Sequence, residues 1–128
     1  MSEQALLRAE NLSLSVAGRL LQKELTFDVR PGEILALMGG SGCGKSTLMR
    51  HLVGLQQPAC GRIVYGDVDL AAASEAQMAQ IRSRLGVMFQ SGALWSSMSV
   101  GENVMLPLTE LTNLDEGAVE QVARFKLA

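Results

Sequence analysis

Hydrophobic and polar positions alternate in the first third of the chain. Within residues 12–16, leucine, leucine and valine are separated by serines, and residues 25–29 repeat the alternation. A period of two predicts half-buried strands. The segments 17–19 and 30–33 contain glycine, and the second also has Pro-Gly, so both favour turns. The pattern therefore predicts antiparallel strands in this region.

A continuously apolar run follows at Ile34–Met38. Such a run predicts a strand that is buried on both faces of a parallel sheet. A glycine-rich loop comes next, and within residues 48–53 leucine, methionine, leucine and valine share one helical face. We expect this helix to end before Pro58, which cannot continue it.

The second half of the chain alternates between short strands and capped helices in the same way. Short apolar segments at residues 61–66 and 85–89 predict strands, although Gly86 weakens the second one. Serine and glutamine or glutamate are three residues apart at 74–77 and at 99–102, which is the spacing of a capping box.

Each capping box predicts the start of a helix, and the first of these helices should run over residues 75–84. In addition, Asp115 should cap a last helix that covers residues 118–128.

Composition narrows the possible function classes. The 128 residues are 48% hydrophobic and carry a net charge of -2 without a basic stripe, so we expect no nucleic-acid partner. The cysteines, Cys43 and Cys60, lack metal-ligand spacing and indicate a reducing, cytoplasmic compartment. The N-terminus does not read as a signal peptide, and the longest aliphatic run is too short to cross a bilayer. A role at a membrane would therefore require another subunit to supply the spanning segments.

The strongest chemical signal is the loop between the apolar run and the first helix. Gly39–Ser46 matches the pattern G-x-x-x-x-G-K-[ST] at every position. Glycines allow the chain to curl so that backbone N–H groups converge on phosphate oxygens, and the following helix offers its unpaired N-terminal N–H groups. The predicted nucleotide-binding residues are Gly39, Gly40, Ser41, Gly42, Cys43, Gly44, Lys45, Ser46 and Thr47.

Individual roles follow from the chemistry of the side chains. Lys45 would reach the β- and γ-phosphates of ATP as a point charge, Ser46 would ligate Mg²⁺, and Thr47 would bond the α-phosphate. The alternative interpretation is a glycine-rich turn with a surface lysine. The motif alone would also suit a small-molecule kinase or a GTPase.

Further stretches resemble one family of phosphate-loop proteins. Residues 25–34 and then 39–48 resemble the opening of ATP-binding cassette (ABC) transporter ATPases. Residues 85–90 look like their strand into the Q-loop, and residues 99–108 look like the helix after it. The resemblance implies an α/β P-loop NTPase fold of the ABC-ATPase type. Antiparallel β strands would fill residues 1–33, a phosphate-loop to Q-loop core residues 34–95, and the start of a helical subdomain residues 96–128.

Within the family, the stretch from Phe89 to Leu94 followed by Trp95 looks like the ATPases of bacterial phospholipid-transport (Mla-type) systems. By resemblance, Gln90 would approach Mg²⁺ and the attacking water, a role that suits an amide side chain. The place of the family's usual adenine-stacking aromatic lies near Val16 here. Adenine would therefore gain only apolar contact at Val16, which leaves the preference for ATP over GTP open.

Several elements of the family pattern do not occur within residues 1–128. These are the LSGGQ-like signature, the strand with the catalytic glutamate, and the switch histidine. His51 follows the phosphate loop instead, and we expect it to be a helix-surface residue. Without a carboxylate placed by a motif, we expect this chain to bind ATP but not to hydrolyse it, whereas an intact protein would hydrolyse ATP to drive transport.

The resemblance also implies partners and a location. ATP would be sandwiched between two ATPase subunits, a transmembrane permease would bind the Q-loop region, and the protein would lie at the cytoplasmic face of the inner membrane. Since the apolar strand Ile34–Met38 needs neighbours on both sides, we expect the chain to self-associate. The alternative hypothesis from another class is a nucleotide-binding regulatory module that never hydrolyses ATP. A phosphoryl-transferring kinase is disfavoured by the absence of a recognisable lid segment.

Overall fold

The computed structural model describes residues 5–128, which form two compact units. The first unit ends at Leu85 and the second begins at Gly86. The first contains a sheet and two helices, and the second contains two helices.

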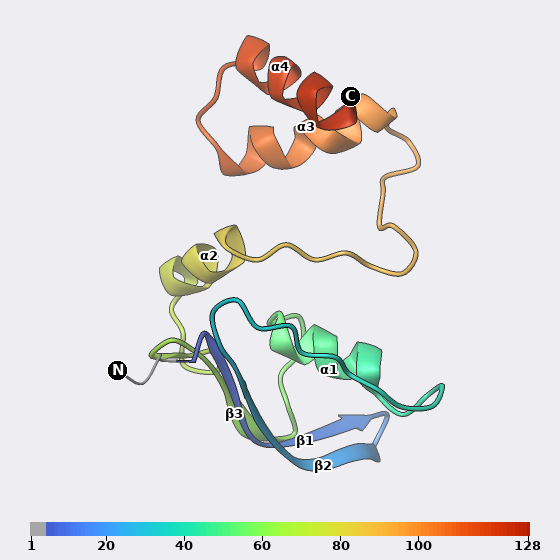
Figure 1. Cartoon of the computed structure of the whole chain (residues 1–128), viewed down its shortest axis with the longest axis vertical. Helices are drawn as coiled ribbons and strands as arrows, with labels where there is room; N and C mark the ends of the chain where they lie inside the picture. The colour runs from blue at the N-terminus through green and yellow to red at the C-terminus, as the bar shows by residue number, and fades with distance from the viewer. Residues whose placement is uncertain (1–4) are drawn as a thin grey trace. The chain divides into compact units, whose positions relative to one another are not determined.

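An antiparallel sheet forms the base of the first unit. Its four strands lie in the order β2-β1-β3-β4, where β1 is Leu7–Val16, β2 is Arg19–Val29, β3 is Cys60–Tyr65 and β4 is Val68–Asp69 (Figure 1). The hairpin between β1 and β2 turns at Ala17 and Gly18, both of which have positive φ. Such two-residue turns match the twist of the flanking strands. The predicted antiparallel strands of the N-terminal third are confirmed, and so is the short strand predicted at residues 61–66.

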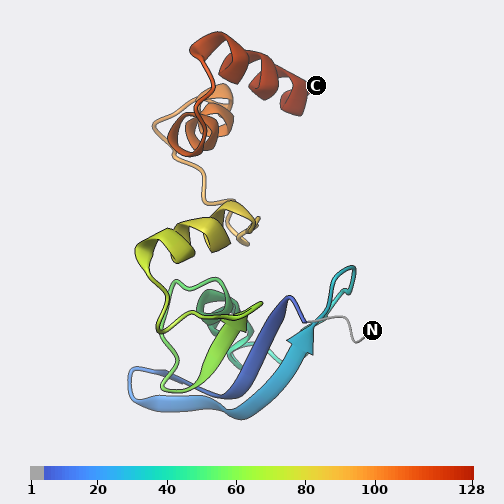
Figure 2. The ribbon, with the colours of Figure 1, turned by 90° about the vertical axis from the view of Figure 1, so that its left-hand side faces the viewer.

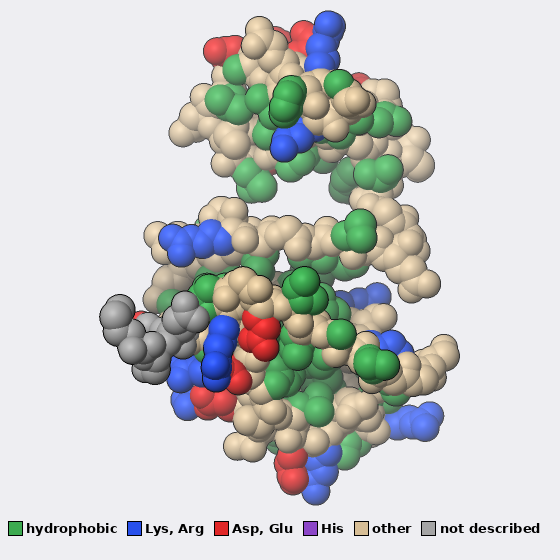
Figure 3. Space-filling view, in the orientation of Figure 1, with side chains coloured by type: hydrophobic (Ala, Val, Ile, Leu, Met, Phe, Trp, Pro, Cys, Tyr) green, Lys and Arg blue, Asp and Glu red, His purple; other side chains and the backbone are tan. Residues whose placement is uncertain are grey.

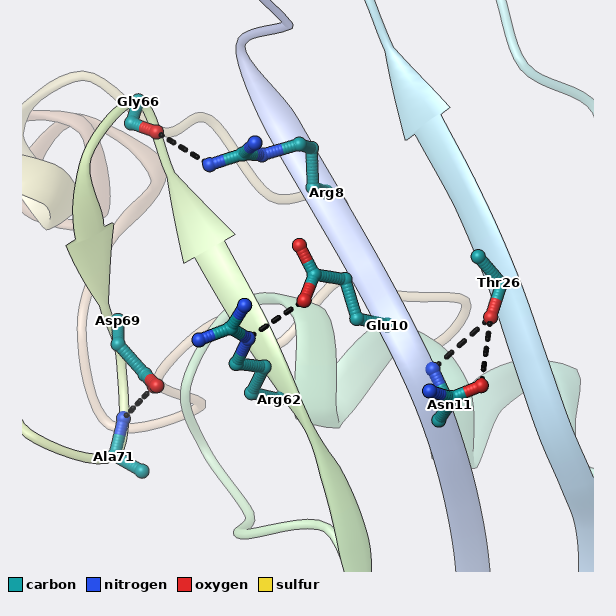
Figure 4. A network of polar contacts seen from close by, with 8 residues as sticks. All are labelled: Arg8, Glu10, Asn11, Thr26, Arg62, Gly66, Asp69 and Ala71. Carbon is teal, nitrogen blue, oxygen red and sulfur yellow. Dashed lines mark hydrogen bonds and ion pairs between the residues drawn. The ribbon is translucent and has the colours of Figure 1, made fainter.

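Polar groups link neighbouring strands of this sheet (Figure 4). Arg62 Nε on β3 donates to Glu10 Oε2 on β1 over 2.6 Å, and Asn11 N on β1 donates to Thr26 Oγ1 on β2 over 3.0 Å. The hydrogen bond and the charge of Glu10 raise the pKa of Arg62. Because the guanidinium is exposed to solvent, the ion pair fixes cross-strand register more than it adds stability.

Helix α1, Lys45–Leu52, lies on one face of the sheet (Figures 1 and 2). Its Leu48 and Leu52 are buried in the core, whereas Met49, which was predicted to share their face, is 46% exposed. The core of this unit combines α1 with the inner face of the sheet. Its buried members are Leu7, Ala9, Leu12, Leu14, Leu48, Leu52, Ile63 and Leu70.

The prediction that His51 lies on the helix surface is wrong. Its side chain is only 3% exposed, and its ring Nδ1 lies 2.7 Å from the carbonyl oxygen of Thr47, one turn earlier in α1. Because a carbonyl can only accept, Nδ1 is the protonated nitrogen. The imidazole can be buried because this hydrogen bond satisfies its donor.

The predicted strands at Ile34–Met38 and at residues 85–89 do not form. Neither segment has a strand partner among residues 5–128, and Ile34 and Met38 are 94% and 92% exposed. A strand exists only when a neighbour accepts its ladder hydrogen bonds. An apolar run by itself therefore does not make a strand.

Helix α2, Glu75–Ser83, completes the first unit. Ser74 and Gln77 form the predicted capping box, in which Ser74 Oγ accepts from the N–H of Gln77 and Gln77 Oε1 accepts from the N–H of Ser74. No residue of α2 is buried, and Met78 and Ile81 are its side chains that pack against the core. The capping box therefore fixes where α2 begins, whereas the burial of its side chains contributes little.

The second unit consists of α3, Val100–Leu111, and α4, Glu116–Leu127. The predicted caps are present, since Ser99 and Glu102 form a capping box and Asp115 accepts from the N–H of Ala118.

Many large apolar side chains of both units remain on the surface (Figure 3). Within residues 5–128, no helix has both the length and the apolar character needed to cross a membrane.

Candidate phosphate-binding site

The loop before α1 has the backbone that the glycine pattern predicts. Gly42 and Gly44 adopt positive φ, at 76° and 100°, a conformation that L side chains rarely take. Gly44 is the N-cap of α1 and provides no side-chain hydrogen bond to the first turn. The N-terminal N–H groups of α1 are therefore free of a protein cap and can serve as donors to an anion.

The ammonium group of Lys45 lies inside the curl of this loop. Its Nζ donates to the carbonyl oxygens of Gly39 and Gly40, both over 2.7 Å, and lies 3.6 Å from Sγ of Cys43. These contacts use all three protons of the ammonium. A phosphate oxygen would compete with these neutral acceptors, and its charge would give a stronger hydrogen bond.

A side chain at the first position of the motif would require a neighbouring side chain to move. A Cβ atom built on Gly39 would lie 2.7 Å from Sγ of Cys43, which is the rotatable end of that side chain. Glycine at this position therefore leaves Sγ of Cys43 in its place 3.6 Å from Nζ of Lys45.

Lys45 also lines a cavity of about 290 Å³ beside the loop. Apolar side chains from β2, α1 and the extended segment before the loop form one part of the wall, and the loop forms another. The side chains that matter for its chemistry are those of Gln22, Leu25, Leu37, Cys43, Lys45 and Leu48. Lys45 provides the only ammonium group among the residues that line this cavity.

The structure brings together the predicted residues from Gly39 to Thr47. Ser46 is exposed and Thr47 is half-buried in the first turn of α1. Val16 lies at the end of β1 and is 47% exposed, as an apolar contact for a base requires. Gln90 is exposed in the second unit, outside any helix or strand, and its approach to Mg²⁺ stays a prediction.

Sequence reasoning missed two residues of β2 that contact the loop. Nε2 of Gln22 donates to the carbonyl oxygen of Cys43 over 2.8 Å, and a Cβ built on Gly44 would lie 3.4 Å from Cβ of Leu21. Neither residue belongs to a motif. The available signal was an amide between apolar and charged residues of a strand, which does not by itself indicate a partner.

Comparison with known proteins identifies the family. Residues 22–128 match the family described as ABC transporter. The chain belongs to this ABC transporter family, as an ATP-binding domain. The match includes the phosphate loop and α1, and it confirms the resemblance inferred from the motifs.

Curated relatives cover nearly the whole chain. The chain is 36% identical over 124 residues to the intermembrane phospholipid transport system ATP-binding protein MlaF of Haemophilus influenzae, with 97% of this chain and 47% of that protein aligned. MlaF of Escherichia coli K12 is 34% identical over 91% of this chain. The probable ribonucleotide transport ATP-binding protein mkl of Mycobacterium leprae is 33% identical over 94% of this chain and 35% of its own length.

Solved structures share the fold. A dimeric post-hydrolysis ATP-binding cassette bound to ADP and Pi superposes with a TM-score of 0.80 at 22% identity, over 91% of this chain and 53% of that chain. The protein cbiO1 of Clostridium perfringens, part of the ABC transporter complex cbiONQ, gives a TM-score of 0.72 at 28% identity over 93% of this chain and 47% of its own. The ABC ATPase fold is confirmed, and the chain spans about half the length of these proteins or less.

Proposed function

We propose that residues 39–47 bind the phosphates of Mg-ATP. The observation that carries this proposal is the position of Lys45, whose ammonium lies within a glycine-rich curl that leads into the uncapped start of α1. Lys45 would exchange its carbonyl acceptors for β- and γ-phosphate oxygens, and the N–H groups of the first turn would bond the remaining oxygens. The Ser46 hydroxyl would hold Mg²⁺, which neutralises charge on the phosphates.

The intact protein would couple ATP binding and hydrolysis to transport. Membership of the ABC transporter family supports this role. Two copies of the ATPase and a transmembrane permease would then assemble at the cytoplasmic face of the inner membrane. The neighbouring structures are described as a dimer and as part of a transporter complex, which supports such an assembly. Lys45 and Gln90 would be the catalytic residues that this chain contributes.

Phospholipid is the transport substrate that we propose. The stretch from Phe89 to Leu94 followed by Trp95 supports it, as do the names of the two MlaF proteins that are 34–36% identical. The mkl relatives, with identities of 33%, are named as probable ribonucleotide transport ATP-binding proteins, so ribonucleotides are the competing substrate class in the test. In the assembled transporter, added phospholipid should stimulate ATP hydrolysis, and ribonucleotides other than ATP should not.

We further propose that residues 1–128 alone bind ATP without hydrolysing it. Among ABC ATPases the carboxylate that assists the attacking water belongs to a motif that these residues do not contain. General-base assistance contributes about 10²–10⁴-fold to a rate. Phosphate release that continues over many turnovers and depends on Lys45 would contradict this proposal and also the non-hydrolysing regulatory module kept as the alternative.

The unpaired apolar segment supports self-association of this chain. Ile34 and Met38 expose more than nine-tenths of their surface, and no strand within residues 5–128 pairs with them. Pairing with a second copy would supply ladder partners and bury these side chains. Sedimentation should therefore show dimers or larger species, and a monodisperse monomer would contradict the proposal.

The experiment that tests nucleotide binding is a calorimetric titration of Mg-ATP into the chain. Lys45→Ala should weaken binding by about tenfold or more, because a hydrogen bond to a charged group contributes about 1.5–3 kcal/mol. Lys126→Ala is the matched control, since it removes the same charge from the exposed end of α4. Equal affinity of the Lys45 and Lys126 variants, or no binding to the wild type, would refute the assignment.

A further inference from the structure

One hydrogen bond connects the sheet to the phosphate loop within residues 5–128. Nε2 of Gln22, on β2, donates to the carbonyl oxygen of Cys43 over 2.8 Å, across 21 positions of sequence. The bond is partly buried, so water competes with it less than at the surface. Gln22 also lines the cavity next to Lys45. The side chain therefore contacts the loop on the side that faces β2.

Strand irregularities on both sides of Gln22 direct this side chain. Leu12 pairs with Leu25 and Leu14 with Gln22, so β2 uses one residue more than β1 in this interval. A second extra residue on β2 follows before Ser15 pairs with Leu20. Bulges of this kind bend a strand and re-aim its side chains.

The backbone also shows the strain expected of such a bulge. Glu24 has a positive φ of 54°, although it is not glycine. Such residues are uncommon and persist where surrounding structure holds them. β2 lies close to the loop at this point, since a Cβ built on Gly44 would lie 3.6 Å from Cγ of Gln22.

The hydrogen bond from Gln22 to the carbonyl of Cys43 also fixes the direction of the next N–H group. None of the described peptide bonds is cis, so the carbonyl of Cys43 and the N–H of Gly44 point in opposite directions. When Gln22 holds the carbonyl toward β2, the N–H of Gly44 points away from the sheet. Gly44 is the N-cap of α1, and its N–H makes no hydrogen bond to any residue from 5 to 128.

We propose that Gln22 is a positioning residue for the phosphate loop. It fixes the Cys43–Gly44 peptide so that the Gly44 N–H faces the bound phosphates, and this inference rests on the proposed function of the loop. A neutral amide suits the task because it donates to a carbonyl without adding a charge that would compete with Lys45 for phosphate. Gln22 itself does not touch the nucleotide.

The test uses the whole 128-residue chain with Gln22→Met, which preserves side-chain length and removes the donor. Gln80→Met is the matched control, because Gln80 lies exposed on α2 of the same unit. The readouts are calorimetric titration with Mg-ATP, the carbonyl carbon resonance of Cys43, and the amide resonance of Gly44 with and without Mg-ATP. Thermal melting without nucleotide reports whether each variant is folded.

The expected result is that Gln22→Met shifts the Cys43 carbonyl resonance and weakens Mg-ATP binding about 3- to 10-fold, the effect of one hydrogen bond. Its Gly44 amide should respond less to Mg-ATP, and Gln80→Met should change none of these values. If Gln22→Met does not fold, Gln22→Leu serves instead, because it also removes the donor and adds no charge beside Lys45. Unchanged affinity and an unchanged Cys43 resonance would overturn the proposal.

Two other outcomes distinguish failure of the positioning role of Gln22 from failure of the proposed function of the loop. Weaker binding with an unchanged Cys43 resonance and a lower melting temperature would mean that Gln22 is merely structural, and this would also overturn the proposal. If the wild type does not bind Mg-ATP while its Cys43 resonance still depends on Gln22, the proposed function of the loop fails. The hydrogen-bonded anchoring of the loop would then stand without a role in nucleotide binding.

Discussion

Replacing single glycines of the phosphate loop by alanine should separate backbone strain from steric contact. A Cβ atom built on either Gly40 or Gly42 meets no atom within 4 Å. The two positions differ in backbone conformation, since Gly42 has φ of 76° and Gly40 does not have a positive φ. The pair therefore forms a matched comparison in one loop, with the same change of side chain.

The expected magnitudes follow from these conformations. At Gly42 an alanine must adopt the left-handed region, which costs about 1–2 kcal/mol. At Gly40 no such cost applies, and alanine restricts the unfolded chain, which stabilises the folded state by about 0.4–1 kcal/mol. Alanine restricts the unfolded chain equally in both variants, so this contribution cancels, and Gly42→Ala should be less stable than Gly40→Ala by about 1–2 kcal/mol.

Urea unfolding followed by circular dichroism measures this difference. Both variants should have the same dependence on denaturant as the wild type, because neither changes the surface that is exposed on unfolding. Equal free energies of unfolding for Gly40→Ala and Gly42→Ala would refute the reasoning. Such a result would mean that the loop relaxes its backbone when glycine is replaced.

Two further predictions concern single side chains. Tyr65→Phe should lower the free energy of unfolding by about 0.5–1.5 kcal/mol in urea titration at neutral pH, because Tyr65 loses its hydrogen bond to the carbonyl of Leu52. Burial raises the pKa of Tyr65, so the wild type alone should lose this stability as the pH rises above about 10. Hydrogen bonds from Ser99 lower the pKa of Glu102, so stability of α3 that is present at neutral pH should be lost as the pH falls below about 4.3, the value in an unfolded chain. Circular dichroism of Glu102→Gln should show less of this acid dependence, and an identical profile would contradict the capping-box assignment.

The elements that the sequence predicted correctly are those whose signals are local. The capping boxes at Ser74 and Ser99 and the cap at Asp115 appear as expected, since each joins groups three residues apart. The backbone conformation of the glycine-rich loop and the helix start after it were predictable for the same reason. Its glycines, lysine and helix start are contiguous, and the required backbone conformations belong to the residue types themselves.

The errors arose where the result depends on distant partners. The apolar composition of Ile34–Met38 is that of a buried strand, yet the segment is exposed because no described residue completes its ladder. His51 lies on a helix that has polar neighbours, and only packing against the sheet places its imidazole in the interior. Burial depends on both surfaces that pack together, and the local sequence of a segment describes only one of those surfaces.

The sequence by itself determined that this chain belongs to the ABC transporter family, because the loop pattern G-x-x-x-x-G-K-[ST] occupies consecutive residues at Gly39–Ser46. Only the tertiary structure decided which side chains outside the motif hold that loop. Gln22 reaches Cys43 from a strand 21 positions away, directed by bulges that depend on the register between β1 and β2. The register depends on many cross-strand contacts together, so no single residue of β2 predicts it.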